Sequence, residues 1–341
     1  MTDGSGTVSA ALRSAVTTLH AAGVPSAAHD ARVLMAAALN RDGVVPGDAP
    51  VTPMDLVLRG GDPEPASYRA MVDRRAAREP LQFILGVAAV VGVDLAVGPG
   101  VFIPRPETDL LIDWAASRVV DWEARRRSSA LRRALTPPRF TVVDFCSGPG
   151  TVSLGLAHLL TRAALADRLD LRIVGIDVSP TAVGYADQNL ADWRGRGEID
   201  PRIVVEFHRG DATDAALVTG LGLVAGADLV LSNPPYVPEG EHGEQVAAAD
   251  PEVAADPHGA VYSGADGLEL MRPLSRIIAL TCAPFADVAV EHDDATGSRV
   301  RELLADAGIT DLVQHRDLAG RDRFVTGEVR RDPGDRGMRL Q

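Results

Sequence analysis

The tetrapeptide Asn233-Pro234-Pro235-Tyr236 is the part of this chain whose residue types most directly suggest a reaction. It follows an apolar run at 229–231, and the Asn233 side-chain oxygen and the Pro234 carbonyl can both accept hydrogen bonds. Two successive prolines restrict the backbone, so the Pro234 carbonyl is held before any substrate binds. Two fixed acceptors can hold the N–H groups of an amide or an aromatic amine, and Tyr236 can lie against the flat group. The pattern predicts methylation of a planar nitrogen; the alternative is a proline-rich exit from a strand.

A glycine-rich loop and an acidic strand end lie upstream of this tetrapeptide. The apolar run 140–145 predicts a buried parallel strand, and the loop 146–150, with two spaced glycines, leads into a helical pattern. Glycines let a ligand approach the backbone closely. The next apolar run ends in Asp177, whose carboxylate can accept hydrogen bonds from ribose hydroxyls. The loop lacks the G-x-G-x-x-G pattern, and Pro149 removes a donor that a pyrophosphate needs, so S-adenosylmethionine is favoured over NAD.

The charge balance argues against stable binding to nucleic acid. The formal net charge is −13 at pH 7, and the 34 basic residues are all arginine. The dense basic run within residues 125–139 is interpreted as a solvated helix end and linker. Two cysteines predict no disulfide framework, no apolar run approaches the ~18 residues of a membrane helix, and the first residues lack a signal-peptide pattern. We expect a cytoplasmic protein without membrane contact, and the histidine spacing predicts no metal site.

The order of the expected elements predicts an α/β fold preceded by a smaller helical domain. Helical patterns begin near residues 8, 26 and 67, and the Gly-, Pro- and Asp-rich stretch 40–66 is expected to be irregular. From residue 140 onward, apolar runs alternate with helical patterns, as in parallel sheets, and the last strands are expected at 286–291 and 323–329. The expected domains are a helical domain (1–79), a linker with a β-hairpin (80–100) and a catalytic domain (101–341).

Several separated segments resemble the HemK-type protein-(glutamine-N5) methyltransferases. Besides the tetrapeptide, they are residues 30–34, 78–86, 98–108, 264–268 and 316–323, so the resemblance extends over about residues 8 to 329. The resemblance implies a Rossmann-like class I S-adenosylmethionine-dependent methyltransferase sheet, a small N-terminal helical domain that docks the substrate, and S-adenosyl-L-methionine as the methyl donor. It also implies methyl transfer to the side-chain amide of a protein glutamine, such as the Gly-Gly-Gln glutamine of peptide-chain release factors.

The same resemblance implies roles for individual residues. Asp177 would hold the ribose and Asp211 would lie near the adenine, while Arg105 is open between a structural ion pair and a place near the cofactor carboxylate. The substrate-binding residues would be Asn233, Pro234, Pro235 and Tyr236, with Asn233, Pro234 and Tyr236 catalytic. The cofactor-binding residues would be Phe102, Arg105, Thr108, Asp144, Cys146, Gly148, Gly150, Asp177, Asp211 and Asn233.

Departures from the family pattern leave the substrate open. Cys146 stands where the release-factor enzymes usually have a third glycine, and it resembles instead the branch that methylates a glutamine of a ribosomal protein. Asp256 replaces a more usual glutamate, and residues 260–264 and 291–297 also differ. The alternatives are a ribosomal-protein glutamine, an exocyclic amine such as adenine N6 in nucleic acid, and a non-catalytic binder that keeps the fold. The acidic balance counts against nucleic acid, and the intact tetrapeptide counts against a binder without activity.

Overall fold

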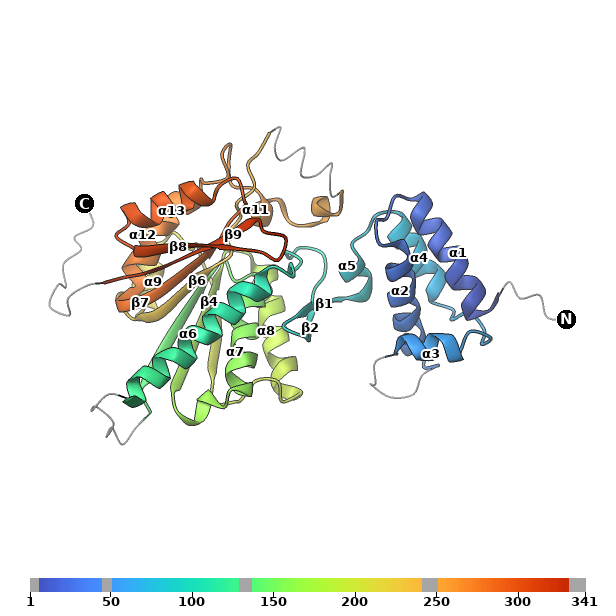
Figure 1. The fold of residues 1–341 in the computed structure, drawn as a ribbon, viewed down its shortest axis with the longest axis horizontal. Helices are drawn as coiled ribbons and strands as arrows, with labels where there is room; N and C mark the ends of the chain where they lie inside the picture. Colours follow the sequence, from blue (N-terminus) through green and yellow to red (C-terminus); the bar gives the residue numbers. More distant parts are fainter. Residues whose placement is uncertain (1–5, 45–50, 129–136, 241–250, 331–341) are drawn as a thin grey trace. The chain divides into compact units, whose positions relative to one another are not determined.

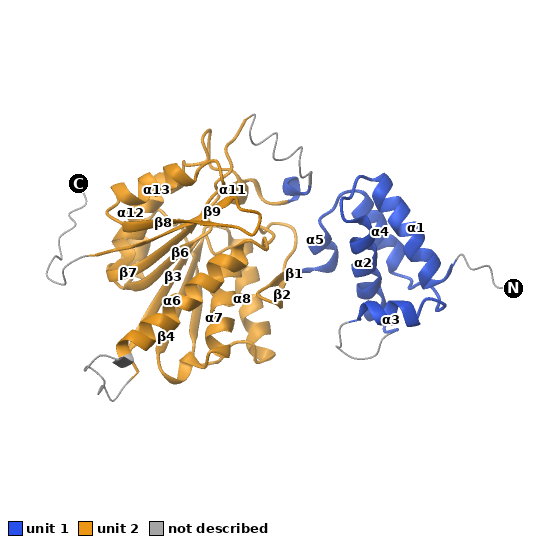
Figure 2. Ribbon diagram, viewed as in Figure 1, with its two compact units in different colours: residues 1–87, 250–255 blue, residues 88–249, 256–341 orange. Residues whose placement is uncertain are grey.

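The computed structural model describes residues 6–44, 51–128, 137–240 and 251–330 (Figure 1). It divides into two compact units, unit 1 with residues 1–87 and 250–255, and unit 2 with residues 88–249 and 256–341 (Figure 2). The helices of unit 1 are α1 (Val8–Ala21), α2 (Ala27–Arg41), α3 (Pro53–Leu58), α4 (Tyr68–Ala76), α5 (Leu81–Leu85) and the 3-10 helix Pro251–Ala255.

The elements of unit 2 alternate between strands and helices over most of its length. Its strands are β2 (Val93–Ala96), which pairs with β1 (Val87–Val90) as a separate two-stranded sheet, β3 (Arg139–Phe145), β4 (Asp170–Asp177), β5 (Val204–Arg209), β6 (Ala227–Ser232), β7 (Cys282–Glu291), β8 (Thr310–Arg316) and β9 (Asp322–Glu328). Its helices are α6 (Thr108–Ser128), α7 (Thr151–Arg162), the 3-10 helix Leu165–Asp167, α8 (Pro180–Gly195), α9 (Ala215–Gly220), α11 (His258–Val261), α12 (Met271–Thr281) and α13 (Gly297–Asp306).

Unit 1 is built on the apolar faces of α1, α2 and α4. Their buried side chains form one core, which includes Val8, Leu19, Leu34, Met35, Leu39, Tyr68 and Met71. The expectation that residues 40–66 are irregular is wrong at α3. There the Thr52 hydroxyl accepts from the Asp55 N–H, the Asp55 carboxylate accepts from the Thr52 N–H, and Pro53 fills the first turn. This capping box starts a short helix inside a stretch of turn-forming composition.

A buried ionic cluster holds α2, α4 and residues 251–255 together within unit 1. Arg75 is 3% exposed, and its guanidinium lies 2.8 Å from Asp30 Oδ2 and 2.7 Å from Glu252 Oε1. Asp30 also accepts from the Ser26 hydroxyl at 2.7 Å. Arg75 therefore bridges the buried Asp30 and the partly buried Glu252, which also pairs with Arg78 at 3.0 Å. A buried ion pair of this kind is stable only while both partners are present.

The main sheet of unit 2 has the order β5-β4-β3-β6-β7-β9-β8. Strands β3 to β7 pair in parallel and β9 runs antiparallel to β7 and to β8. Helices α6, α7 and α8 cover one face and α9, α12 and α13 the other (Figure 1). The predicted Rossmann-like class I methyltransferase sheet is thus confirmed. The chain leaves β3 first toward β4 and β5 and later toward β6, so the sheet has its switch point between β3 and β6.

The sequence-based prediction of the last strands missed β8. The strands expected near 286–291 and 323–329 are present as β7 and β9, and β8 lies outside them at the sheet edge. Strand β8 contains polar residues such as Asp311, Gln314 and His315 and has no fully buried position, so it lacks the apolar signal of the central strands.

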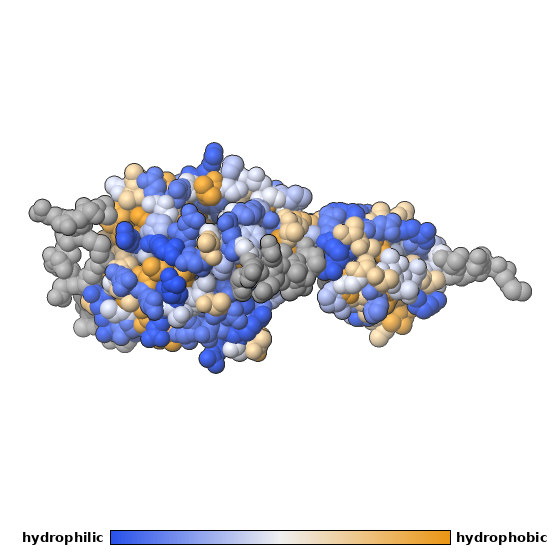
Figure 3. Space-filling model, turned by 90° about the horizontal axis from the view of Figure 1, so that it is seen from above, coloured by the Kyte–Doolittle hydropathy of each residue, from blue (hydrophilic) through white to orange (hydrophobic). Residues whose placement is uncertain are grey.

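Hydrophilic residues cover most of the face shown in Figure 3, with apolar residues interspersed among them. Each helix in the described part of the chain is too short or too polar to span a bilayer.

The Arg75 cluster gives a prediction about stability. Replacing Arg75 by Met leaves the buried Asp30 carboxylate without its cation, while Glu252 keeps its ion pair with Arg78, and we expect a loss of about 3–5 kcal/mol. Arg69→Met is the matched control on the same helix, because the Arg69 side chain is 74% exposed and its ion pair with Glu64 contributes less than about 1 kcal/mol. Thermal and urea unfolding measure both; equal effects of the two substitutions would contradict the prediction.

Candidate active site

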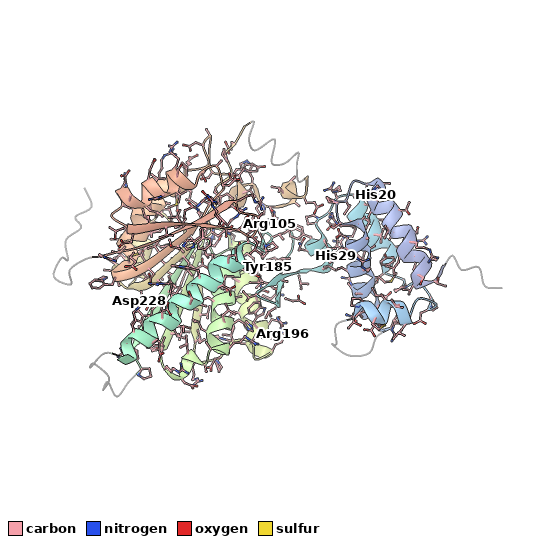
Figure 4. The ribbon with its side chains drawn as sticks, viewed as in Figure 1. His20, His29, Arg105, Tyr185, Arg196 and Asp228 are labelled. Carbon is pink, nitrogen blue, oxygen red and sulfur yellow. The ribbon has the colours of Figure 1, made fainter. Side chains whose placement is uncertain are left out.

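Four polar residues lie in one row at the carboxyl edge of the parallel strands. The register pairs Phe145 of β3 with Ile176 of β4 and with Ser232 of β6, and Ser232 with Val290 of β7. The next residue of each strand is therefore at the same level. In sheet order these are Asp177, Cys146, Asn233 and Glu291. Figure 4 labels Arg105 near this edge and Asp228, on β6, toward the opposite one.

Asp144, near the end of β3, connects this strand to the first turn of α7. Its Oδ2 accepts from the N–H and the hydroxyl of Ser153, at 3.1 and 2.7 Å, in the first turn of α7. Burial raises the pKa of the Asp144 carboxyl to about 7, against the hydrogen bonds from Ser153. Asp144 Oδ1 and the Ser147 hydroxyl are buried with no hydrogen-bond partner among the described residues. Two polar atoms therefore lie ready for a ligand.

Asp177 ties the end of β4 to the glycine loop. Its Oδ2 accepts from the Gly148 N–H at 2.8 Å, and its Oδ1 accepts from the Ser179 N–H at 2.9 Å. Each carboxylate oxygen keeps a second lone pair, which can accept from a hydroxyl. Burial raises the pKa of Asp177 above its ordinary range, while these two backbone bonds favour the charged form.

Three residues of the loop from Cys146 to Gly150 have a positive φ, a conformation that favours glycine. Gly148 and Gly150 have φ of 55° and 92°, and Cys146 has φ of 60°. A Cβ added at Gly148 meets no atom within 4 Å, so the space beside it is open. At Gly150 a Cβ would lie 2.8 Å from Leu154 Cδ1. Desolvation and the charges of Asp177 and Asp144 raise the pKa of the Cys146 thiol, which keeps it neutral.

The Asn233 amide is held by a chain of hydrogen bonds that crosses three elements. Asn233 Nδ2 donates to Thr108 Oγ1 at 3.3 Å, and the Thr108 hydroxyl donates to Glu291 Oε2 at 2.9 Å. The Tyr236 hydroxyl donates to Glu291 Oε1 at 3.4 Å. Thr108 and Glu291 are each 1% exposed. Asn233 Oδ1 accepts no hydrogen bond from the described residues, so this oxygen is available to a donor on a substrate.

Residues 261–267 contact the backbone at the end of the tetrapeptide and at Val237, the residue after it. The Val237 N–H donates to the Val261 carbonyl at 2.9 Å, and the Ser263 N–H donates to the Val237 carbonyl at 3.0 Å. A Cβ at Gly267 would lie 2.3 Å from the Tyr236 carbonyl oxygen, so only glycine allows this close approach. The segment 264–268 is therefore needed for the position of the tetrapeptide backbone.

Asp256 holds the segment that contains Phe102 and Arg105. Its Oδ1 accepts from the Ile103 N–H at 2.9 Å, and its Oδ2 pairs with the Arg105 guanidinium. The Arg105 guanidinium carbon also lies 5.1 Å from the centre of the Phe102 ring. The structure therefore shows Arg105 in an ion pair with Asp256. A position of Arg105 near the cofactor carboxylate stays a prediction.

Asp211 is not one of the four residues of the row, but its negative charge is among the causes that raise the pKa of the Cys146 thiol. It is exposed and follows β5, and its Oδ1 accepts from the N–H and the hydroxyl of Thr213 at 2.8 and 2.7 Å. The other residues expected at the site come from β3, β4 and β6 or the loops that follow these strands, from the segment between β2 and α6, and from the first residue of α6.

Comparisons with known proteins agree with this geometry. The family described as PrmC N-terminal domain matches residues 10–86. The release factor glutamine methyltransferase of Corynebacterium glutamicum is 38% identical over 322 residues, which cover 94% of this chain and 98% of that protein. The chain belongs to the release factor glutamine methyltransferase family. The resemblance to HemK-type glutamine methyltransferases is thereby confirmed, and this family member is an S-adenosylmethionine-dependent methyltransferase.

One further relative and one solved structure have other names. A 4-amino-L-phenylalanine/4-methylamino-L-phenylalanine methyltransferase of Streptomyces pristinaespiralis is 35% identical over 311 residues, 90% of each chain. Among solved structures, the ribosomal protein L11 methylase from Lactobacillus delbrueckii subsp. bulgaricus has 14% identity and a TM-score of 0.40, covering 68% of this chain and 82% of that chain.

The site of this methyltransferase fits S-adenosylmethionine. The unpartnered Asp144 Oδ1 suits an ammonium group, the spare lone pairs of Asp177 suit ribose hydroxyls, and the open space at Gly148 leaves room for a ligand against the backbone. A carboxylate-lined site also suits a cofactor that carries a positive charge.

Reasoning from the sequence missed Glu291 as a residue of the site, although the signal was present. Glu291 ends an apolar strand just as Asp177 does, and parallel strands end at one edge. It also missed Ser153, whose partner Asp144 it had included, and Ser147, whose buried hydroxyl has no partner among the described residues.

The backbone at Cys146 gives a prediction for this methyltransferase. A residue with φ near 60° is strained by about 1–2 kcal/mol unless it is glycine, and a β-branched residue is strained more. We expect Cys146→Gly to keep the free energy of unfolding within about 1 kcal/mol, and Cys146→Val to lower it by about 2 kcal/mol or more. Urea unfolding of both variants measures this, and a valine variant as stable as the glycine variant would refute it.

Proposed function

We propose that this methyltransferase transfers a methyl group from S-adenosylmethionine to the side-chain amide nitrogen of a glutamine in a protein, the Gly-Gly-Gln glutamine of a peptide-chain release factor. The proposal is supported by family membership and by the name of the Corynebacterium relative. The observation that carries it is the Asn233 amide, whose nitrogen is tied to Thr108 and whose oxygen is left for a donor. With such a partner, we expect the enzyme to act in the cytoplasm.

The residues of the β3 and β4 edge are proposed to hold the cofactor. When bound, S-adenosylmethionine supplies a methyl group activated by a positively charged sulfur. Asp177 would accept from the ribose hydroxyls and Asp144 Oδ1 from the amino group. The further proposed cofactor residues are Phe102, Arg105, Thr108, Cys146, Gly148, Gly150, Asp211 and Asn233.

The tetrapeptide is proposed to bind and orient the amide. Asn233 Oδ1 and the Pro234 carbonyl would each accept one N–H of the target nitrogen. An amide nitrogen is a poor nucleophile because its lone pair is delocalised, and two fixed acceptors favour a pyramidal nitrogen with a localised lone pair. Pro235 fixes the backbone that carries the Pro234 carbonyl, and the Tyr236 ring would pack against the flat group. The enzyme's contribution is position and electrostatics, with no covalent enzyme intermediate.

A second candidate is the aromatic amine of a small molecule. It is favoured by the 35% identity to the 4-amino-L-phenylalanine methyltransferase over 90% of the chain. The same two acceptors would hold an aromatic amine, so the tetrapeptide does not separate the two substrates. Cys146 keeps a ribosomal-protein glutamine as a further alternative.

Incubation with methyl-labelled S-adenosylmethionine separates these candidates. Purified unmodified release factor, ribosomal proteins, 4-amino-L-phenylalanine and adenine-containing nucleic acid are the acceptors. Label at the Gly-Gly-Gln glutamine, located by mass spectrometry, is the expected result. Label in the free amino acid alone would replace the proposal by the second candidate.

Loss of the Asn233 acceptor should affect turnover far more than cofactor binding. We expect Asn233→Ala to lower kcat by on the order of 10²-fold or more, because one of two aligned acceptors is missing. Affinity for S-adenosylmethionine, measured by calorimetry, should change much less than kcat, because the other proposed cofactor residues remain. Asn40→Ala, at an exposed position of α2, is the matched control. Near-normal turnover of Asn233→Ala would rule out the proposed role.

Loss of the Asp177 carboxylate should affect cofactor binding. Charged hydrogen bonds contribute about 1.5–3 kcal/mol, so we expect Asp177→Ala to weaken S-adenosylmethionine binding by about 10-fold to 100-fold. Asp187→Ala, at an exposed position of α8, controls for the loss of one negative charge. Calorimetry measures both affinities, and the proposed role of Asp177 is incorrect if they are equal.

A further inference from the structure

Glu291 is a buried carboxylate that none of the roles above uses. It ends β7 beside Asn233 in the row of strand ends, and it is 1% exposed. Its two oxygens accept from two different hydroxyls, that of Thr108 at 2.9 Å and that of Tyr236 at 3.4 Å. Burying a carboxylate is costly, so a group kept there needs an explanation.

The direction of these hydrogen bonds is fixed by chemistry. An ionised carboxylate can only accept, so the Thr108 hydroxyl must give its single hydrogen to Glu291. Toward Asn233 the Thr108 oxygen can then only accept. The side of the Asn233 amide that faces Thr108 must be the NH₂ group, at 3.3 Å, and Oδ1 must point away from Thr108.

We propose that Glu291 is a positioning residue that sets, through Thr108, which end of the Asn233 amide faces the substrate. The inference rests on the proposed function, because Oδ1 is useful only to a substrate that offers an N–H. Through the Tyr236 hydroxyl the same carboxylate holds the last residue of the tetrapeptide, so one group orders both ends of the substrate-holding segment.

The opposite protonation state shows why the charge matters. A protonated Glu291 can donate to Thr108, and the Thr108 hydroxyl is then free to donate to the Asn233 oxygen. The amide can turn over and present its NH₂ group to the substrate, where two donors would face each other. The proton on Glu291 therefore separates a productive arrangement from an unproductive one.

The surroundings of Glu291 raise its pKa, so its carboxyl group can change protonation state near neutral pH. Burial raises the pKa of Glu291 to about 7, while the Thr108 hydrogen bond and the charge of Arg323 favour the ionised form. Glu107, before α6, acts in the opposite direction, and the Tyr236 hydroxyl favours the ionised form. Burial also raises the pKa of Tyr236, which keeps it a donor to Glu291. Since the ionised form is the productive one, turnover should fall as pH falls through about 7.

The experiment uses the full-length enzyme with unmodified release factor as the acceptor. Glu291→Gln has the same shape but can donate to Thr108, and we expect it to lower kcat by about 10-fold to 100-fold, less than loss of the acceptor itself. Affinity for S-adenosylmethionine should be unchanged, and the melting temperature should not fall. The acid limb of the pH–kcat profile near pH 7 should disappear. Glu302→Gln, exposed on α13, is the matched control.

A double-substitution cycle separates orientation from general damage. Thr108→Val removes the hydroxyl that links Glu291 to Asn233. If Glu291 acts through Thr108, the combination Thr108→Val with Glu291→Gln should lose no more turnover than the more damaged single variant. Additive losses would overturn the proposal, because they would mean that the two residues act independently.

A readout without substrate keeps this inference separate from the proposed function. In enzyme labelled with ¹³C and ¹⁵N, the side-chain NH₂ resonances of Asn233 should shift with pH together with the carboxyl carbon resonance of Glu291, and this shift should vanish in Glu291→Gln. If release factor is not methylated by the wild type but these resonances titrate together, the proposed function fails and the link from Glu291 to Asn233 stands. If the Asn233 resonances ignore both the pH and the substitution, the link is refuted.

Discussion

The register of the four central parallel strands determines the whole site. One alignment brings Asp177, Cys146, Asn233 and Glu291 to the same level, from β4, β3, β6 and β7. Strands that are buried on both faces are continuous apolar runs. Their side-chain pattern therefore gives little preference for the observed register over one shifted by a residue. Between β3 and β6, hydrogen bonds from polar side chains favour the observed register. The Asp228 carboxylate accepts from the Thr141 N–H at 2.9 Å near one end, and the Ser232 hydroxyl donates to the Phe145 carbonyl at 2.9 Å at the other. These bonds link strand pairing directly to the position of Asn233.

A second property follows from the same row, because it collects acidic groups. Asp144, Asp177 and Glu291 all lie near the carboxyl edge, and burial raises the pKa of each. Arg105, the labelled cation near this edge, is paired with Asp256 (Figure 4). Burial disfavours the ionised form of these carboxyl groups and a cationic ligand would favour it, so the site is an electrostatic complement of a sulfonium cofactor. The backbone and hydroxyl hydrogen bonds to these groups keep them ordered without such a ligand.

The sequence predicted those parts of the fold that depend on local patterns. The strands β3, β4 and β6 are continuous apolar runs, and Asp177 and Asn233 are visible as polar residues where such runs end. Helix α3 was missed because its capping box lies among turn-forming residues, and β8 was missed because it is an edge strand with polar residues. The Arg75 cluster could not be predicted, since Asp30 and Glu252 are far from it in sequence and only the folded chain brings them together. Glu291 was missed because it is far from the tetrapeptide in sequence, and only the pairing of β6 with β7 brings it beside Asn233.

The tetrapeptide contains the Asn233 amide, but it does not determine whether the oxygen or the nitrogen of that amide faces the substrate. The two ends of an asparagine amide have nearly the same shape, so packing alone cannot choose between them; a hydrogen-bond chain can, provided that it ends in a group whose role is fixed. A carboxylate is such a group, because it only accepts, and the Thr108 hydroxyl transmits its choice to Asn233. The reactivity that the tetrapeptide suggests therefore depends on α6 and β7 as much as on the four residues themselves. An Asn-Pro-Pro-Tyr segment in another fold would need an equivalent chain before the same chemistry could be inferred from it.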